Sequence, residues 1–344
     1  MINKLTIDPS PSRKPTVRAL WEPAMNDKLS RRQLLAASGS TIGAGLLCSL
    51  SNPATAIARG SEEAKSPLFS FCLNMSTVRG QQLGVVKQVE LAAKAGYDSI
   101  EPWMREIDAF VKEGGKLKDL GKQIRDSGLT VESAIGFARW IVDDDNERKM
   151  GLEQAKRDMD TLNQIGGKRI AAPPVGATNQ TDLDLFAAAE RYRTLLELGR
   201  EMGIIPQAEV WGFSKSLSRL GETTLVAVES GHPDACLLPD VYHIFKGGSD
   251  FNGLKLLGPQ AIHVFHMNDY PANPPRTEMN DSHRVYPGDG VAPIGDILRT
   301  LRDNGCRCVL SLELFNRDYW KQDPMVVAKT GLKKMRTSVA KALA

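Results

Sequence analysis

The sequence predicts one α/β domain, a closed (β/α)8 barrel, and three observations carry that prediction. Apolar strand-like runs alternate with amphipathic helical runs through residues 67–344, which is length enough for one barrel-sized domain. Eight strands alternating with eight helices favour a parallel sheet that closes on itself. A doubly wound open sheet is the alternative, but no G-x-G-x-x-G motif follows the first strand.

Each predicted strand is a short apolar run that is followed by a helical run. Residues 81–96 and 183–203 are examples of the helical runs, with apolar residues at helical spacing and an end at Gly96 and Gly203. The predicted strands span residues 68–75, 97–103, 129–136, 168–174, 204–211, 235–242, 261–268 and 307–315.

The first 58 residues resemble an export signal of the twin-arginine type. Arg31 and Arg32 precede a moderately apolar run rich in Gly, Ala and Ser, and small residues then offer a cleavage site after Ala58. A buried helix that starts with two arginines is the alternative. The run is too short and too interrupted to stay as a membrane span after signal removal. We therefore expect a signal peptide at 1–58, a linker at 59–66, a barrel at 67–344 and a periplasmic or otherwise exported protein.

The charge distribution argues against a nucleic-acid partner. The chain has a formal charge of +3; residues 1–58 hold seven basic and three acidic residues, which gives +4 and leaves −1 for the rest. The body therefore has no surplus of positive charge with which to hold a phosphate backbone. Four cysteines scattered in or beside predicted strands indicate core filling rather than a disulfide framework (Cys72, Cys236, Cys306 and Cys308). Homo-oligomerisation is left open.

Ionisable residues end the last four predicted strands. In a parallel barrel the chemistry lies where strands end, at the carboxyl-terminal face. Glu209, Asp240, His266 and Glu313 hold these positions and are expected to converge. A single Glu there is more often solvated or salt-bridged, but buried carboxylates gathered together are costly unless a cation binds them. Three carboxylates and one imidazole suit one divalent ion such as Mn²⁺, Mg²⁺, Co²⁺ or Zn²⁺.

Residues 263–290 begin as a buried strand and continue as a loop rich in Pro, Asn, Asp and Gly. Loops of this length are usually functional or disordered. With His266 as a metal ligand, we expect the loop to fold over the site and to bring Arg284 to a substrate oxygen. Pairing of Arg284 with Asp281 to fix the loop is the alternative. His263 is expected to face the helix layer as a core residue.

Other polar residues are expected to line the same mouth and to contact the substrate. His243 follows the sixth strand, and a surface histidine is the alternative there. Asn268 continues the rim after the seventh strand. Glu101 and Trp103 end the second strand, where Glu101 would contact a sugar hydroxyl or a water on the metal, or form a structural salt bridge. For Arg79, which follows the first strand, neither a structural nor a binding role is favoured.

Taken together, these motifs resemble those of the xylose isomerase-like TIM barrels, the sugar phosphate isomerase/epimerase superfamily, and within it the inosose (2-keto-myo-inositol) isomerases. The resemblance covers about residues 66–344. Ketose epimerases of the superfamily carry a second acid shortly after the first metal-binding Glu, where this chain has Lys215, which argues against simple C3 epimerisation. The shared features are AE at Glu209, D-x-x-H from Asp240, H-x-x-D from His266, D-x-x-R-V-x-P-G-x-G from Asp281 to Gly290, and S-x-E-L-F around Glu313.

The resemblance implies metal-assisted proton transfer on a free keto-sugar or inosose, since phosphorylated sugars are scarce outside the cytoplasm. The metal would bind the carbonyl and a neighbouring hydroxyl and stabilise an enediolate. Glu209 and Glu313, on opposite sides, would remove and return the proton, with His243, Arg284 and Glu101 orienting the substrate. The same enediolate can eliminate a β-hydroxyl, so a dehydratase is the alternative enzyme, and a non-catalytic sugar-binding barrel is the alternative outside catalysis.

Overall fold

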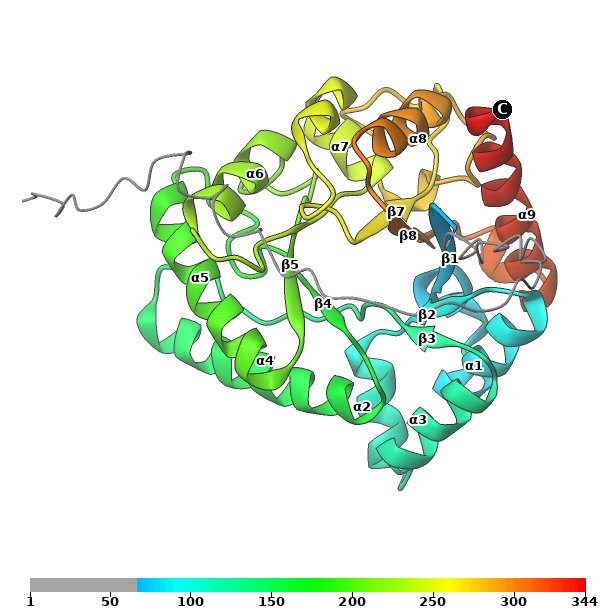
Figure 1. The fold of residues 1–344 in the computed structure, drawn as a ribbon, viewed down its shortest axis with the longest axis horizontal. Coiled ribbons are helices and arrows are strands. Elements are labelled where there is room, and N and C mark those ends of the chain that lie inside the picture. The colour runs from blue at the N-terminus through cyan, green and yellow to red at the C-terminus, as the bar shows by residue number, and fades with distance from the viewer. Residues whose placement is uncertain (1–66) are drawn as a thin grey trace, which may run out of the picture. The chain divides into compact units, whose positions relative to one another are not determined.

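The computed structural model describes residues 67–344, and these form a parallel eight-stranded barrel covered by helices (Figure 1). The signal peptide predicted at 1–58 and the linker predicted at 59–66 lie outside the described residues. Among residues 67–344, no helix combines the length and the apolar character that a membrane crossing needs.

All strand pairs are parallel. The strands are β1 (Phe69–Asn74), β2 (Ser99–Glu101), β3 (Thr130–Val131), β4 (Arg169–Ala172), β5 (Ile205–Glu209), β6 (Leu237–Leu238), β7 (Val264–Met267) and β8 (Cys308–Leu312). Hydrogen bonds join them in the orders β3-β2-β1-β8-β7 and β4-β5-β6. Isolated parallel bridges close both gaps, from Val131 to Gly167 and from Asp240 to His266. The closed barrel is therefore confirmed over the doubly wound sheet.

Helices separate all successive strands, and two of them, not the expected one, lie between β2 and β3. The glycine pair at 114–115 ends the first of these two, with Gly114 at a φ of 90°. The predicted helix ends at Gly96 and Gly203 are confirmed. The α-helices are α1 (Gly84–Ala95), α2 (Met104–Lys112), α3 (Leu117–Asp126), α4 (Asp145–Gln164), α5 (Leu185–Met202), α6 (Leu220–Glu229), α7 (Val241–Gly247), α8 (Ile294–Asp303) and α9 (Pro324–Leu343).

Short 3-10 helices lie in the connections between these strands and helices. They are η1 (Met75–Gln81), η2 (Phe251–Leu256), η3 (Asp281–His283) and η4 (Tyr319–Lys321). The core lies inside the barrel and between the strands and the helices. All four described cysteines are free and buried, as predicted.

Strand register brings polar residues to one level at the carboxyl ends of the strands. Asn74 of β1 pairs with Glu101 of β2, and His266 of β7 pairs with Ser311 of β8. Asp240, just after β6, bridges to His266 on its other side. These residues come from distant parts of the sequence and meet because parallel strands all end at the same face of the barrel.

Candidate metal centre and substrate site

Three of the four predicted metal ligands form a compact buried group. One donor atom from each of Asp240, His266 and Glu313 lies within 4.8 Å of the other two, and all three residues are buried. His266 Nδ1 is 3.2 Å from Glu313 Oε2 and 3.8 Å from Asp240 Oδ2. The nitrogen and the two carboxylate oxygens thus face a common point.

Asp240 is held in place because it also caps a helix. It is the N-cap of α7, where its Oδ1 accepts a hydrogen bond from the backbone N–H of His243 at 2.8 Å. Its Oδ2 points the other way and accepts from Asn268 Nδ2 at 2.9 Å. Asn268, which was expected to contact the substrate, also accepts a hydrogen bond from the Tyr242 N–H, and this bond holds the Asn268 side chain in position to orient the Asp240 carboxylate.

Glu209 ends β5 and lies beside this group without being one of its three closest donors. It is 3% exposed, and its Oε2 has no hydrogen-bond partner among the described residues. Burial, together with the Glu313 and Asp240 carboxylates, raises the pKa of Glu209 to about 8 although His266 acts in the opposite direction. The fourth predicted ligand is therefore a buried carboxylate with a free oxygen near the triad.

Glu101 orients His266. Glu101 Oε2 lies 3.0 Å from His266 Nε2 and also accepts from Ser311 Oγ at 2.6 Å and from Asn74 Nδ2 at 2.8 Å. A carboxylate on one imidazole nitrogen fixes the tautomer and leaves the other nitrogen for a metal. Of the roles that the sequence left open for Glu101, the structure shows the ion pair, with His266, and contact with a substrate or a metal-bound water stays a prediction.

The residues present fit a divalent cation. Buried acceptors without a donor cost about 1–3 kcal/mol each, and a cation would satisfy them. Four buried carboxylates gather here, while in the described part of the chain Arg284 is the permanent cation that bonds to two of them. The buried atoms at this site without a hydrogen-bond partner are Glu101 Oε1, Gln207 Oε1, Glu209 Oε2, His266 Nδ1 and Arg284 Nε.

Arg284 reaches the centre of the site, as the sequence predicted for the long loop. It is 1% exposed, and its Nη1 lies 2.8 Å from Glu313 Oε2 and 3.0 Å from Asp240 Oδ2. Its Nη2 pairs with Asp281 and lies 3.0 Å from His243 Nε2. The predicted pairing of Arg284 with Asp281 is therefore present, and contact with a substrate oxygen stays a prediction. Burial and the neighbouring guanidinium lower the pKa of His243, so the buried imidazole is neutral.

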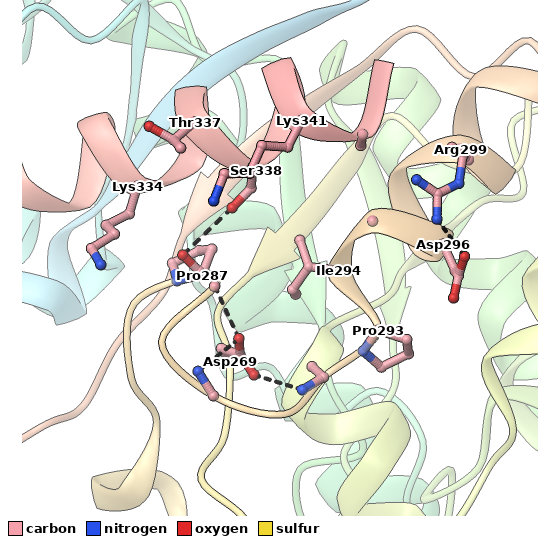
Figure 2. A pocket seen from close by; sticks show the side chains of 15 residues that line it. Asp269, Pro287, Pro293, Ile294, Asp296, Arg299, Lys334, Thr337, Ser338 and Lys341 are labelled. Atoms are coloured by element: carbon pink, nitrogen blue, oxygen red, sulfur yellow. Dashed lines mark hydrogen bonds and ion pairs between the residues drawn. The ribbon is translucent and has the colours of Figure 1, made fainter. Parts of the chain in front are cut away.

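Asp269 holds the loop that delivers Arg284. Backbone bonds pair Asp269 with Val285, the residue after Arg284. The carboxylate accepts from the backbone N–H groups of Tyr270, Gly288, Gly290 and Ala292 at 2.8–3.0 Å. Figure 2 shows Asp269 pointing into the loop between Pro287 and Pro293. A Cβ on Gly290 would lie 2.3 Å from Asp269 Oδ1, so the H-x-x-D and P-G-x-G motifs form one structure.

We predict that Asp269→Ala lowers the free energy of unfolding by about 3–5 kcal/mol, because it removes a buried charged acceptor and leaves several N–H groups unpaired. Urea denaturation measures this. Asp289→Ala is the control in the same loop, since Asp289 makes a surface ion pair with Lys334 and should change stability by less than about 0.5 kcal/mol. Equal effects of the two substitutions would contradict this role of Asp269.

A pocket of about 450 Å³ lies next to this loop. It is bounded by the loop, the start of α8 and α9, and it includes none of the candidate metal ligands (Figure 2). The loop therefore has two sides that differ in chemistry, with Arg284 contacting the buried carboxylates and Asp269 lining the outer pocket.

An aromatic wall of Trp103, Phe137, Trp211, Phe213 and Phe315 extends beside the polar centre. Trp103 lies 5.3 Å from Phe137 and 6.0 Å from Phe315, and Phe137 lies 6.2 Å from Trp211, between ring centroids. Trp211 in turn lies 5.0 Å from Phe213. Phe137 and Phe213 are 39% and 49% exposed. Trp103 was predicted to line the mouth, whereas the other four were missed although each follows a strand end.

Asn74 was also missed, and the positional rule that found the acids would have found it. It is the last residue of β1, a polar residue at the end of an apolar run. Its Nδ2 donates to Glu101 Oε2 and to Glu313 Oε1, and its Oδ1 accepts from Trp103 Nε1 at 3.0 Å. Asn74 therefore connects the aromatic wall to the candidate metal centre.

We predict that Glu101→Gln weakens divalent-metal binding by about 10–100-fold, because the neutral amide no longer holds the His266 tautomer or raises the basicity of the imidazole. Calorimetric titration with Zn²⁺ or Mn²⁺ measures the affinity. Glu132→Gln is the matched control, since Glu132 pairs with Lys168 and Arg169 outside the site. Unchanged affinity in Glu101→Gln would remove Glu101 from the support of the metal.

Similar proteins point to one family. A family model described as xylose isomerase-like TIM barrel matches residues 89–338. An inosose isomerase of Bacillus velezensis is 24% identical over 78% of this chain and 97% of its own length. A 3-dehydroshikimate dehydratase of Pseudomonas aeruginosa is 23% identical over 72% of this chain and 39% of its own length.

A solved structure of the IolI protein with a bound zinc atom superposes with a TM-score of 0.72 and 21% identity, over 79% of this chain and 99% of that one. That likeness supports the barrel fold independently of the sequence motifs. Because the family model spans most of the barrel, the chain belongs to the xylose isomerase-like TIM barrel family.

Proposed function

We propose that this protein is a divalent-metal-dependent isomerase or epimerase of a free keto-sugar or cyclitol such as an inosose. The observation that carries the proposal is the buried group of Asp240, His266 and Glu313 at the barrel mouth, with His266 Nδ1 facing the two carboxylates. The relatives named inosose isomerase support the substrate class.

Asp240, His266 and Glu313 would hold the metal, with Glu209 as a fourth ligand. A bound divalent ion would polarise the substrate carbonyl and stabilise the negative charge that develops when the neighbouring C–H proton leaves. The zinc atom bound to the similar IolI protein supports a metal of this kind. Carboxylate and imidazole ligands also suit Mn²⁺, Mg²⁺ and Co²⁺.

The chain's own side chains would perform the proton transfer. Glu209 has a free carboxylate oxygen and would remove the proton, while Glu313, a member of the triad, would return it. Arg284, which contacts Asp240, would donate a hydrogen bond to a substrate oxygen. Neutral His243, beside Arg284, would accept one from a substrate hydroxyl. The aromatic wall would cover the apolar C–H face of the ring and exclude water from the reacting carbons.

A dehydratase remains the second candidate, because relatives named 3-dehydroshikimate dehydratase also match and the site residues suit either outcome. NMR and mass analysis of products from a panel of keto-sugars, 2-keto-myo-inositol and 3-dehydroshikimate separate the two. An isomeric product of unchanged mass supports the isomerase, and loss of one water supports the dehydratase. Tight binding without any product would support the non-catalytic barrel.

We further propose that the protein is exported before it acts, which would expose it to free rather than phosphorylated sugars. The support is the paired Arg31 and Arg32 before the apolar leader. We predict that the double substitution Arg31→Lys and Arg32→Lys retains most of the protein in the cytoplasm of a host with a twin-arginine pathway. Immunoblots of cell fractions measure this, and unchanged export of the variant would contradict the proposal.

A further inference from the structure

Arg79 lies beside the site with no acid paired to it among the described residues. It follows β1 in η1, and its guanidinium carbon lies 3.8 Å from the Trp103 ring centroid and 5.1 Å from that of Phe315. Its Nε and Nη2 atoms are buried and have no hydrogen-bond partner. By contrast, Arg105 stacks on the same Trp103 ring at 4.9 Å but is exposed and lies 3.9 Å from Glu106.

Arg79 is close to the candidate metal centre. The Phe315 ring that contacts Arg79 lies 4.9 Å from the Arg284 guanidinium carbon, so one ring adjoins both cations. Trp103, on which Arg79 stacks, donates to Asn74, and Asn74 donates to Glu313 Oε1 at 3.2 Å. A ligand held by the metal and covered by the aromatic wall would therefore have Arg79 within reach of one of its edges.

The two unpaired nitrogens define the kind of group that would fit. Nε–H and Nη2–H form one edge of the planar guanidinium and point the same way, which is the geometry that binds both oxygens of a carboxylate. A buried donor left without an acceptor costs about 1–3 kcal/mol, so an anion from a ligand would relieve this cost. Burial and Arg105 lower the pKa of Arg79 to about 10, so the side chain is still charged at neutral pH.

We propose that Arg79 binds a carboxylate of the substrate, so that the substrate is an acidic keto-sugar or a carboxylated cyclic polyol. This inference rests on the proposed function, since it assigns a substrate class to that site. The buried edge of the guanidinium and its stacking on Trp103 carry the proposal. Arg284 is less suited to this role, because its Nη1 and Nη2 already contact Asp240, Glu313, Asp281 and His243. Only its Nε is left unpaired, and one donor cannot bind both oxygens of a carboxylate.

Calorimetry on the metal-loaded protein tests the proposal with two matched probe pairs, shikimate with its methyl ester and D-glucuronate with its methyl ester. We expect at least one acid to bind about tenfold or more tightly than its ester. This ratio should fall to about one in Arg79→Gln and stay at the wild-type value in Arg105→Gln. Arg79→Lys, which keeps the charge but not the planar edge, should retain part of it.

No preference for either acid, or the same preference in Arg79→Gln, would overturn the assignment. Metal content and thermal melting of each variant show whether it is folded. If Arg79→Gln does not fold, the comparison is made with Arg79→Lys, in which the preference for the acid should be reduced. Wild-type exchange of solvent deuterium into 2-keto-myo-inositol and a panel of neutral and acidic keto-sugars tests the proposed function separately. If deuterium exchanges but neither acid binds more tightly than its ester, only the role of Arg79 is contradicted. If an acid binds more tightly than its ester but no keto-sugar shows exchange or product, only the proposed chemistry is contradicted.

Discussion

His266→Gln is expected to lower divalent-metal affinity by at least about a hundredfold. His266 Nδ1 is the atom that faces both Asp240 Oδ2 and Glu313 Oε2, and the Glu101 contact on Nε2 fixes the ring in that orientation. Loss of a residue that hydrogen-bonds to a metal ligand lowers metal affinity by about 10–100-fold, and loss of the ligand itself should lower it further. Metal analysis after gel filtration, followed by calorimetric titration, measures the effect.

His263→Gln is the matched control for this experiment. His263 lies just before β7 and is half-buried, and its pKa is lowered to about 4 by burial and by Arg169. It lies at the opposite end of β7 from the metal centre and is half-buried, not a fully buried core residue as the sequence predicted. Full metal affinity in His266→Gln, or equal losses in both variants, would show that the triad does not bind the metal.

Glu209→Gln is expected to slow proton transfer by about 10²–10⁴-fold while the metal stays bound. The three closest donors come from other residues, and a glutamine oxygen can still act as a neutral ligand, so the metal should remain. The amide, however, cannot accept the substrate proton. Exchange of solvent deuterium into 2-keto-myo-inositol measures the rate, and metal analysis of the same sample confirms loading.

Glu229→Gln, at the exposed end of α6, controls for the loss of one negative charge. If Glu209→Gln exchanges deuterium at the wild-type rate with its metal bound, Glu209 is not the base. If Glu209→Gln instead loses the metal, Glu209 is an essential ligand, and the prediction that the other three residues retain the metal fails.

The sequence predicted the barrel and the converging acids for the same physical reason. Strands were recognisable as apolar runs, and parallel strands must end at one face, so Asp240, His266 and Glu313 could be grouped before any coordinate was known. This grouping uses only the position of each residue at the end of its strand and does not require the distances between the side chains. It extends to Asn74, which the sequence analysis did not single out.

The pairing of side chains within that face depends on register and rotamers, which residue order does not determine. Glu101 and Asn268 end strands in the same way as the metal-ligand candidates, yet the first bonds to His266 and the second to Asp240. Asp269 sits one residue after Asn268 but points into the loop. The break between α2 and α3 was missed because apolar spacing continues on both sides of the glycine pair.

The position of Arg79 was equally hidden in the sequence. Nothing near residue 79 indicates that Trp103 and Phe315 will lie against it, because these contacts join loops after β1, β2 and β8. Strand order places those three strands side by side, and only the structure shows which side chains fill the space above them.

The most direct test of the central claim is deuterium incorporation from D₂O into 2-keto-myo-inositol and a panel of neutral and acidic keto-sugars. The measurement compares chelator-treated protein with the same protein reloaded with one divalent ion per chain. The account predicts exchange at the carbon next to the carbonyl of at least one substrate, lost with the metal and restored by reloading. Exchange that persists at the full rate in the chelated protein, or a reloaded protein that binds metal and exchanges none of the substrates, would contradict metal-assisted proton transfer at this site.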